Sequence, residues 1–257
     1  MSDRDNEIDE SSAPLLDHLI ELRNRLLWCM IGFAAAFGLC FYFATEIFEF
    51  LVRPLQEAFA DGEGRLIYTQ LYEAFFVEIK VAMFGAFVIA FPLIAMQIWA
   101  FVAPGLYKNE KRAFLPFLIA TPILFTAGAA LAYYVVMPTA FRFFLAYQGD
   151  VAGLDQEALP AIGDYLSLVM RFILIFGIAF LLPVLLLLLN RAGLVDRQQL
   201  VKARRYIIVL VFIIAAVFTP PDPITQLMLA VPLCLLFEIT LLIIWFTDRK
   251  RRKSQSA

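Results

Sequence analysis

Long apolar runs alternate with short polar segments along the chain. Five of the six runs contain about twenty residues or more, the length that an α-helix needs to cross a hydrocarbon core of about 30 Å. Several runs contain proline, which kinks a helix. The pattern predicts an all-α integral membrane protein with six transmembrane helices, several of them kinked by proline, at about residues 26–44, 74–102, 114–137, 164–189, 206–218 and 224–246.

The fifth run, residues 206–218, is too short for an ordinary crossing and is followed by Thr219-Pro-Pro-Asp-Pro223, which ends a helix. It is either a re-entrant half-span or a true span in a thinned bilayer. Most of the 21 lysines and arginines lie in the two termini and in the 103–112 and 190–205 connections. Six crossings place all four segments on one side, and the positive-inside rule makes that side cytoplasmic. We therefore predict six spans, cytoplasmic termini and two short C-terminal spans.

The polar segments complete the expected organisation of one polytopic membrane domain, residues 1–257. The acidic residues 1–14 are expected to form a flexible cytoplasmic tail, and the basic residues 247–257 a second cytoplasmic tail. The 45–73 connection carries apolar residues at helical spacing, which predicts short helices lying over the bilayer. The connection of residues 138–163, rich in glycine and acid, is expected to be a loop.

Composition excludes several classes of function. The chain is 62% hydrophobic, well above a globular domain, and its three cysteines have no CxxC or metal-ligand spacing. It contains no GxxxxGK[ST] loop and no HExxH sequence, and its single histidine, His18, has no partner that the sequence reveals. We expect no enzymatic activity, no cofactor, no metal and no nucleic-acid partner.

An amphipathic stretch, residues 18–26, leads directly into the first span. Glu21 precedes Arg25 by four residues, the favourable order for an ion pair on one helix face. One interpretation is an interfacial anchor whose arginines meet lipid phosphates. The other is a docking surface that presents a carboxylate to a ligand. A narrow stripe of leucines is compatible with both interpretations, the anchor and the docking surface. It consists of Leu15, Leu19, Leu22 and Leu26.

Four ionisable residues lie at membrane depth, where a charge costs roughly 2.5–3.5 kcal/mol at a helix centre. Glu78, Lys80 and Arg171 lie near the outer helix ends, where long side chains can reach the surface. Glu238 lies about two turns from the cytoplasmic end. It is either a contact for a partner or substrate in the bundle interior, or a structural hydrogen-bonding group.

Several motifs are similar to those of TatC, the multispanning receptor subunit of the twin-arginine protein translocase. Their order and spacing across the predicted spans make the resemblance specific and extend it over nearly the whole chain. The matching stretches are HLIELRNRL (18–26), RPL (53–55), QIWAFVAPGLYKNEKR (97–112), FGIAFLLPV (176–184), TPPD (219–222) and CLLFE (234–238).

The resemblance implies a concave, cytoplasm-facing cup that binds signal peptides carrying consecutive arginines. The cytosolic glutamates of the family match Glu21 and Glu110, whose carboxylates can pair with the planar guanidinium group of an arginine. Leu22, Arg23 and Arg25 match the same signal-peptide site. The positions with an implied structural or partner-contact role are Pro54, Lys80, Phe101, Asp222, Gln226 and Glu238.

The resemblance also implies partners and a location. The expected partners are TatA-like and TatB-like single-span proteins, folded precursor proteins and the bilayer, with export driven by the proton motive force. A homo-oligomer within a larger complex of the bacterial cytoplasmic (inner) membrane is expected. Leu181 departs from the family, where many relatives carry a polar residue, often glutamate. The alternatives are a membrane scaffold without transport activity and a secondary transporter for a small solute that uses Glu238, Lys80 or Arg171 in ion coupling.

Overall fold

The computed structural model is nearly all helical within the residues that it describes, namely 2–59, 64–106, 115–151, 154–156, 158–191, 193–219 and 222–255. Five segments of the described chain are long and apolar enough to cross a membrane. The predicted class of all-α integral membrane protein is therefore confirmed, while the count of six spans stays a prediction. The five segments are His18–Tyr42, Glu73–Phe101, Pro116–Leu145, Ile162–Arg191 and Pro223–Thr247.

The helices form long rods joined by short connections. One two-stranded antiparallel hairpin, β1 with β2, follows α5. The elements are α1 (Ser2–Tyr42), α2 (Ala44–Gln56), α3 (Glu73–Leu106), α4 (Leu115–Leu131), the π-helical turn η2 (Ala132–Val136), α5 (Met137–Leu145), β1 (Gly149–Val151), β2 (Leu154–Gln156), α6 (Ile162–Ala179), α7 (Leu182–Arg191), α8 (Arg197–Phe218) and α9 (Pro223–Gln255).

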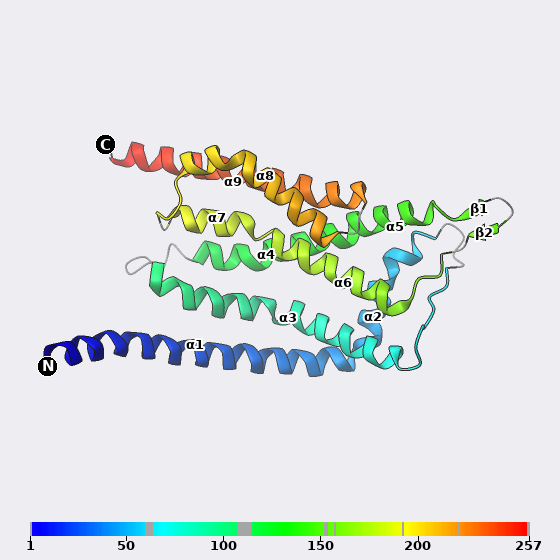
Figure 1. The fold of residues 1–257 in the computed structure, drawn as a ribbon, viewed down its shortest axis with the longest axis horizontal. Coiled ribbons are helices and arrows are strands. Elements are labelled where there is room, and N and C mark those ends of the chain that lie inside the picture. The colour runs from blue at the N-terminus through cyan, green and yellow to red at the C-terminus, as the bar shows by residue number, and fades with distance from the viewer. Residues whose placement is uncertain are drawn as a thin grey trace.

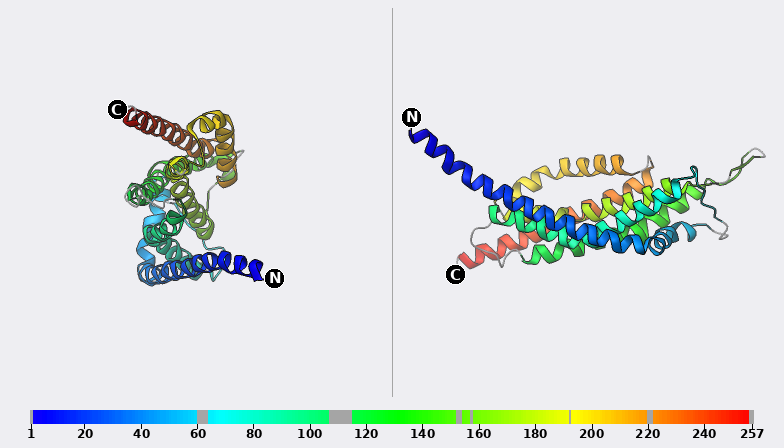
Figure 2. Two further views of the ribbon diagram at one scale, coloured as in Figure 1. Left: turned by 90° about the vertical axis from the view of Figure 1, so that its left-hand side faces the viewer. Right: turned by 90° about the horizontal axis from the view of Figure 1, so that it is seen from below.

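The long helices lie side by side, with α1 at one edge and α8 and α9 at the other (Figure 1). Helix α1 packs mainly on α3, α4 packs on α6, and both α7 and α8 pack on α9. Seen end-on, this order makes a curved row rather than a closed bundle (Figure 2). Both chain ends lie at one end of the row, and the β1–β2 hairpin lies at the other (Figure 1).

The third apolar segment is longer than the sequence predicted. It reaches Leu145, eight residues beyond the expected end at Met137, so the connection expected over residues 138–163 begins later. Pro138 does not end the helix because it occupies the first turn of α5, where a missing backbone N–H costs no helical hydrogen bond. The wider η2 turn immediately before it supplies the transition.

The fourth segment, expected as one helix over residues 164–189, is two helices. Helix α6 ends at Ala179, and α7 begins at Leu182 with Pro183 in its first turn. Pro183 has no N–H to donate to the carbonyl of Ala179 four residues earlier, and its ring crowds that carbonyl, which accounts for a break at this place. A proline kink was expected in this span, and the structure places it at Phe180 and Leu181.

The fifth helix also begins earlier than its apolar run. Helix α8 starts at Arg197 because a capping box joins Asp196 and Gln199, each side chain bonding to the other residue's backbone N–H. Its first turns are therefore polar, and only the later part is apolar. For this reason α8 is not among the five segments that meet the length and composition expected of a span.

The two terminal helices extend beyond the expected spans. Helix α1 reaches back to Ser2 and so includes residues 2–14 of the segment for which a flexible tail was expected. Helix α9 likewise continues to Gln255. A helix already nucleated adds residues at little cost, so a long apolar span can carry its helix into a polar flank.

Helix α2 is the short helix expected in the 45–73 connection, and its apolar face joins the main core. Its Pro54 has no N–H, which leaves the carbonyl of Phe50 without its helical donor. The Tyr133 hydroxyl donates to that carbonyl at 2.6 Å, and the Tyr165 hydroxyl donates to the carbonyl of Leu51 at 2.8 Å. Tyr133 of η2 thus replaces the donor that the proline removes, and the two tyrosines together fix α2 to η2 and α6.

Glu73, the first residue of α3, ties the connection before it to α6. Its Oε1 accepts a hydrogen bond from the Gly163 N–H at 2.8 Å. Its Oε2 accepts from the N–H and hydroxyl of Thr69, at 2.6 and 2.9 Å, and from the N–H of Gln70 at 3.3 Å. One carboxylate therefore satisfies three backbone donors at the ends of two helices.

A Glu73→Ala variant is expected to be less stable than the wild type, because three backbone donors lose a charged acceptor. Thermal unfolding of the detergent-solubilised protein should show a lower midpoint. Glu78→Ala is the matched control, since Glu78 is an exposed acid on the same helix and makes no hydrogen bond or ion pair within the described chain. Equal unfolding midpoints for the two variants would contradict a stabilising role for the hydrogen bonds of Glu73.

Candidate functional site

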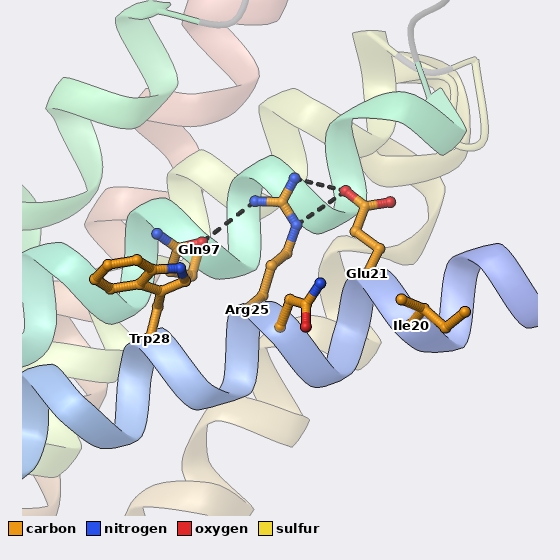
Figure 3. Close-up of a pocket in the computed structure, with 6 residues that line it drawn as sticks. Ile20, Glu21, Arg25, Trp28 and Gln97 are labelled. Atoms are coloured by element: carbon orange, nitrogen blue, oxygen red, sulfur yellow. Dashed lines mark hydrogen bonds and ion pairs between the residues drawn. The ribbon is translucent and has the colours of Figure 1, made fainter.

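A pocket of about 520 Å³ opens between α1 and α3, in the amphipathic stretch before the first span (Figure 3). The wall from α1 repeats every four residues, as one helix face requires. Helix α3 contributes a single side chain from the opposite wall. The lining residues are Ile20, Glu21, Asn24, Arg25, Trp28 and Gln97.

Arg25 connects the two walls of this pocket. Its Nε and Nη2 donate to Glu21 Oε1 at 2.9 and 2.6 Å, and its Nη1 donates to Gln97 Oε1 at 3.3 Å (Figure 3). The ion pair predicted from the four-residue spacing of Glu21 and Arg25 is thus confirmed. The same guanidinium also fixes α1 against α3, which the sequence did not predict.

The Glu21 carboxylate keeps one oxygen available. Both hydrogen bonds from Arg25 go to Oε1, whereas Oε2 accepts no hydrogen bond within the described chain and has His18 Nδ1 3.8 Å away. The Glu21 side chain is 36% exposed, so a ligand can reach it. Since an ionised carboxylate offers about four acceptor positions, Glu21 can accept further charge-assisted hydrogen bonds while Arg25 stays in place.

His18 and Phe101 make a second contact between the same helices. Their rings stack with centroids 4.3 Å apart and planes 17° apart. Phe101 belongs to the structural positions implied by the resemblance, and this contact gives it a physical role. His18, expected as an interfacial helix residue, lies beside the pocket as a packing residue.

The rest of the amphipathic stretch faces outward. Leu22 and Arg23 are both exposed and do not line the pocket. Leu19 and Leu26 of the leucine stripe are also exposed, at 60% and 57%, so the chain itself does not bury the stripe. The interpretation as an interfacial anchor therefore remains compatible with a docking surface, because the two use different faces of α1.

Glu110, the second expected carboxylate, lies outside the described residues. Its placement beside Glu21 stays a prediction. Gln97 and Phe101, which the structure does describe, come from the same motif a few residues earlier and lie against α1. They show that this motif begins at the pocket.

Asp222 and Gln226 stabilise the start of α9. The Thr225 N–H donates to Asp222 Oδ1 at 2.7 Å, and the Thr225 hydroxyl donates to Oδ2 of the same carboxylate. The amide of Gln226 donates to the carbonyl of Phe212 at 3.2 Å and so joins α9 to α8. These contacts fit the structural role expected for both residues.

Glu238 has a partner within the chain. Arg204 Nη2 of α8 donates to Glu238 Oε2 at 2.5 Å, and both side chains are substantially exposed. Of the two roles left open by the sequence, the structure supplies the structural one, an ion pair between α8 and α9. Because an exposed pair contributes little stability, its main effect is to neutralise a carboxylate at membrane depth.

Lys80 and Arg171 share a cavity near the opposite end of the molecule, between α3 and α6. Lys80 makes no ion pair with Glu78, as expected for positions two residues apart on a helix. Leu181, at the family's polar position, packs against an apolar cluster that contains Phe91 and Phe125. An apolar residue thus fills the place of the usual acid.

Sequence reasoning missed four residues of the pocket. Gln97 was part of a quoted motif without an assigned role. Ile20, Asn24 and Trp28 recur every four residues beside Glu21 and Arg25, and this spacing could have identified the face. No comparable signal pointed to Gln97, because only the packing of α3 on α1 brings it to Arg25.

The described residues hold no cluster of histidine, cysteine or acidic side chains that could bind a metal ion. The three cysteines are free thiols. Cys40 is buried as expected, whereas Cys29 and Cys234 are half-buried. Chemistry at the pocket between α1 and α3 therefore rests on its charged and polar side chains.

Comparison with known proteins gives a consistent result. Residues 17–232 match the family model described as Sec-independent protein translocase protein (TatC). A relative from Magnetococcus marinus, the Sec-independent protein translocase protein TatC, is 49% identical over 248 residues, which cover 96% of this chain and 90% of the relative. The protein of that name from Escherichia coli K12 is 38% identical over 230 residues, with 90% and 87% covered.

Solved structures agree with these relatives. A crystal structure of the twin-arginine translocase receptor TatC in DDM superposes with a TM-score of 0.77 at 40% identity, covering 88% of this chain and 98% of that chain. A second crystal structure of that receptor gives a TM-score of 0.76 at 39% identity.

Proposed function

The chain belongs to the TatC family of Sec-independent protein translocase proteins, and we propose that within the translocase it binds the twin-arginine signal peptides of folded proteins at the cytoplasmic face. The family is one of translocase components rather than of enzymes, and the chain is a multi-pass membrane protein. The proposal adds the ligand, its site and the side of the membrane.

The single observation that supports the site is the available oxygen of Glu21. A twin-arginine peptide brings planar guanidinium groups, which pair with carboxylates through parallel hydrogen bonds. Glu21 accepts both hydrogen bonds from Arg25 through Oε1, while its Oε2 accepts no hydrogen bond within the described chain. A signal-peptide arginine can therefore bind Oε2 without displacing Arg25.

Glu110 is the proposed second carboxylate, one for each of the two arginines, with Leu22, Arg23 and Arg25 completing the site. The proposed topology is a single polytopic domain of six spans in the bacterial cytoplasmic membrane, with both termini cytoplasmic. Both ends of the chain lie at the same end of the long helices, on opposite edges of the row, which agrees with an even number of crossings (Figure 1).

The proposed partners are TatA-like and TatB-like single-span proteins, with the proton motive force driving export from a complex that contains several copies of this chain. A curved row of helices, rather than a closed bundle, leaves long helix faces accessible to such partners (Figure 2). Helix α1 is an example, because only 11% of its apolar window is buried.

The proposal is tested by titrating the detergent-purified protein with a fluorescent signal peptide that carries Arg-Arg, and with its Lys-Lys counterpart. We expect the Arg-Arg peptide to bind about tenfold more tightly, because lysine lacks the planar fork. Glu21→Gln should reduce this preference. Equal affinity of the wild-type protein for both peptides would refute carboxylate recognition of the arginine pair.

A further inference from the structure

A second cavity, of about 730 Å³, lies between α3, α6 and the C-terminal end of α8. Among the described residues, the ionisable ones that line it are Lys80 and Arg171. The one other polar lining residue, Ser167, donates its hydroxyl to the backbone carbonyl of Gly163. The remaining wall is apolar and includes Phe84 and Phe87.

The two cations of this cavity have no anionic partner within the described chain. Neither Lys80 nor Arg171 makes an ion pair or a side-chain hydrogen bond there, and both are exposed. The neighbouring acid at the start of α3, Glu73, is occupied by backbone donors, and Glu78 does not line the cavity. Two uncompensated charges at membrane depth are costly, so an anionic ligand would stabilise them.

The end of α8 shows how deep these charges lie. Lys80 is seven residues from the start of α3, and Arg171 is nine residues from the start of α6, which correspond to about 10 and 14 Å along the helices. Phe218, the last residue of α8, lines the same cavity. Helix α8 therefore ends at the level of the two cations. A span that is shorter than the bilayer thins the membrane locally, so the membrane surface lies near the end of that span.

We propose that this cavity binds an anionic phospholipid of the leaflet opposite the chain termini. The phosphate lies between Lys80 and Arg171, and an acyl chain lies along the apolar wall formed by Phe33, Phe84 and Phe87. Free phosphate would leave that wall uncovered. A transmembrane helix, about 10 Å across and about 30 Å long, is larger than the cavity.

The lipid site is independent of the proposed signal-peptide pocket. Lys80 and Gln97 are seventeen residues apart on α3, about 25 Å along the helix. Failure of one site in an experiment therefore leaves the other untouched. The bound lipid would hold the bilayer thin beside the short end of α8.

The test uses the full chain in nanodiscs of mixed phosphatidylglycerol and phosphatidylcholine, followed by native mass spectrometry of the released protein. The wild type should retain phosphatidylglycerol in preference. Lys80→Gln and Arg171→Gln should each lower its retention about fivefold, because one basic residue near an anionic lipid contributes about a fivefold gain in affinity. The double variant should lower retention on the order of 25-fold. Arg142→Gln, an exposed arginine of α5 outside the cavity, should change nothing.

The double variant Lys80→Arg/Arg171→Lys controls for lipid loss that is caused by misfolding. It keeps both positive charges and should therefore retain the lipid. Loss of the lipid in this variant would contradict binding by charge. Equal retention of both lipids by the wild type, or an equal loss in Arg142→Gln, would overturn the site. So would displacement of the lipid by inorganic phosphate, or photocrosslinking from position 83 in intact membranes to a protein helix instead of a lipid.

Discussion

A Glu21→Arg variant is expected to lose export of twin-arginine substrates almost completely. The substitution removes the carboxylate whose Oε2 is available and places a second cation beside Arg25, which now has no acid to bind. Two like charges about 4 Å apart repel by several kcal/mol at the effective dielectric of a protein surface. The new charge also repels the arginines of the signal peptide. Glu110→Arg should have the same effect if the two acids share the peptide.

The milder Glu21→Gln variant separates charge from shape. It retains an acceptor oxygen but loses the negative charge, and a hydrogen bond to a charged group is worth about 2 kcal/mol. Signal-peptide affinity should therefore fall roughly thirtyfold. Export should decline in proportion while the contact between α1 and α3 persists through His18 and Phe101.

Export is measured with a twin-arginine reporter in cells that lack the native receptor and express each variant at the same level. Glu49→Arg is the control, because Glu49 is an exposed acid on α2 and undergoes the same charge reversal far from the pocket in sequence. It should export normally. Normal export by Glu21→Arg would remove Glu21 from the signal-peptide site.

Sequence alone predicted the parts of this fold that depend on local pattern. Apolar length identified the five long apolar segments of the described chain, and four-residue spacing identified the Glu21–Arg25 pair. Helix ends were less certain because capping and packing decide them. Asp196 and Gln199 start α8 well before its apolar run, and the third segment continues through Pro138 because a proline in a first turn costs no hydrogen bond.

Contacts between helices could not be predicted in the same manner. Gln97 meets Arg25 across 72 positions of sequence, and Arg204 meets Glu238 across 34. Nothing in the residue types selects these partners, because each donor had several possible acceptors at a similar depth. Tyr133 is a further case, since its donation to the Phe50 carbonyl follows from Pro54 only when the fold is known.

A single added methyl group is expected to have a large effect on stability at the crossing of α4 and α6. Gly128 of α4 lies against the backbone of α6, where an added Cβ would stand 2.3 Å from the Phe176 carbonyl oxygen and 2.8 Å from its carbon. On the other helix, a Cβ at Gly177 would stand 2.6 Å from the ring of Phe125. Small residues let two membrane helices approach closely, and here each glycine lies in contact with a residue of the other helix.

Gly128→Ala is expected to lower the free energy of unfolding by about 3 kcal/mol, the upper part of the usual range for overpacking. The contact cannot relax by a rotamer change, because the opposing atoms belong to the backbone. Gly177→Ala should cost less, since the nearest atoms belong to the side chain of Phe125 and not to backbone. Unfolding curves in mixed detergent micelles, recorded by circular dichroism, would measure both differences.

Gly38→Ala makes the comparison decisive because it applies the same substitution where nothing lies within 4 Å of the added carbon. Alanine is favoured over glycine in a helix by about 1 kcal/mol, so this control should be neutral or slightly more stable. Helix propensity acts in the same direction at Gly128 and opposes the predicted loss. A Gly128→Ala protein as stable as Gly38→Ala would mean that α4 and α6 do not approach as closely as the structure places them.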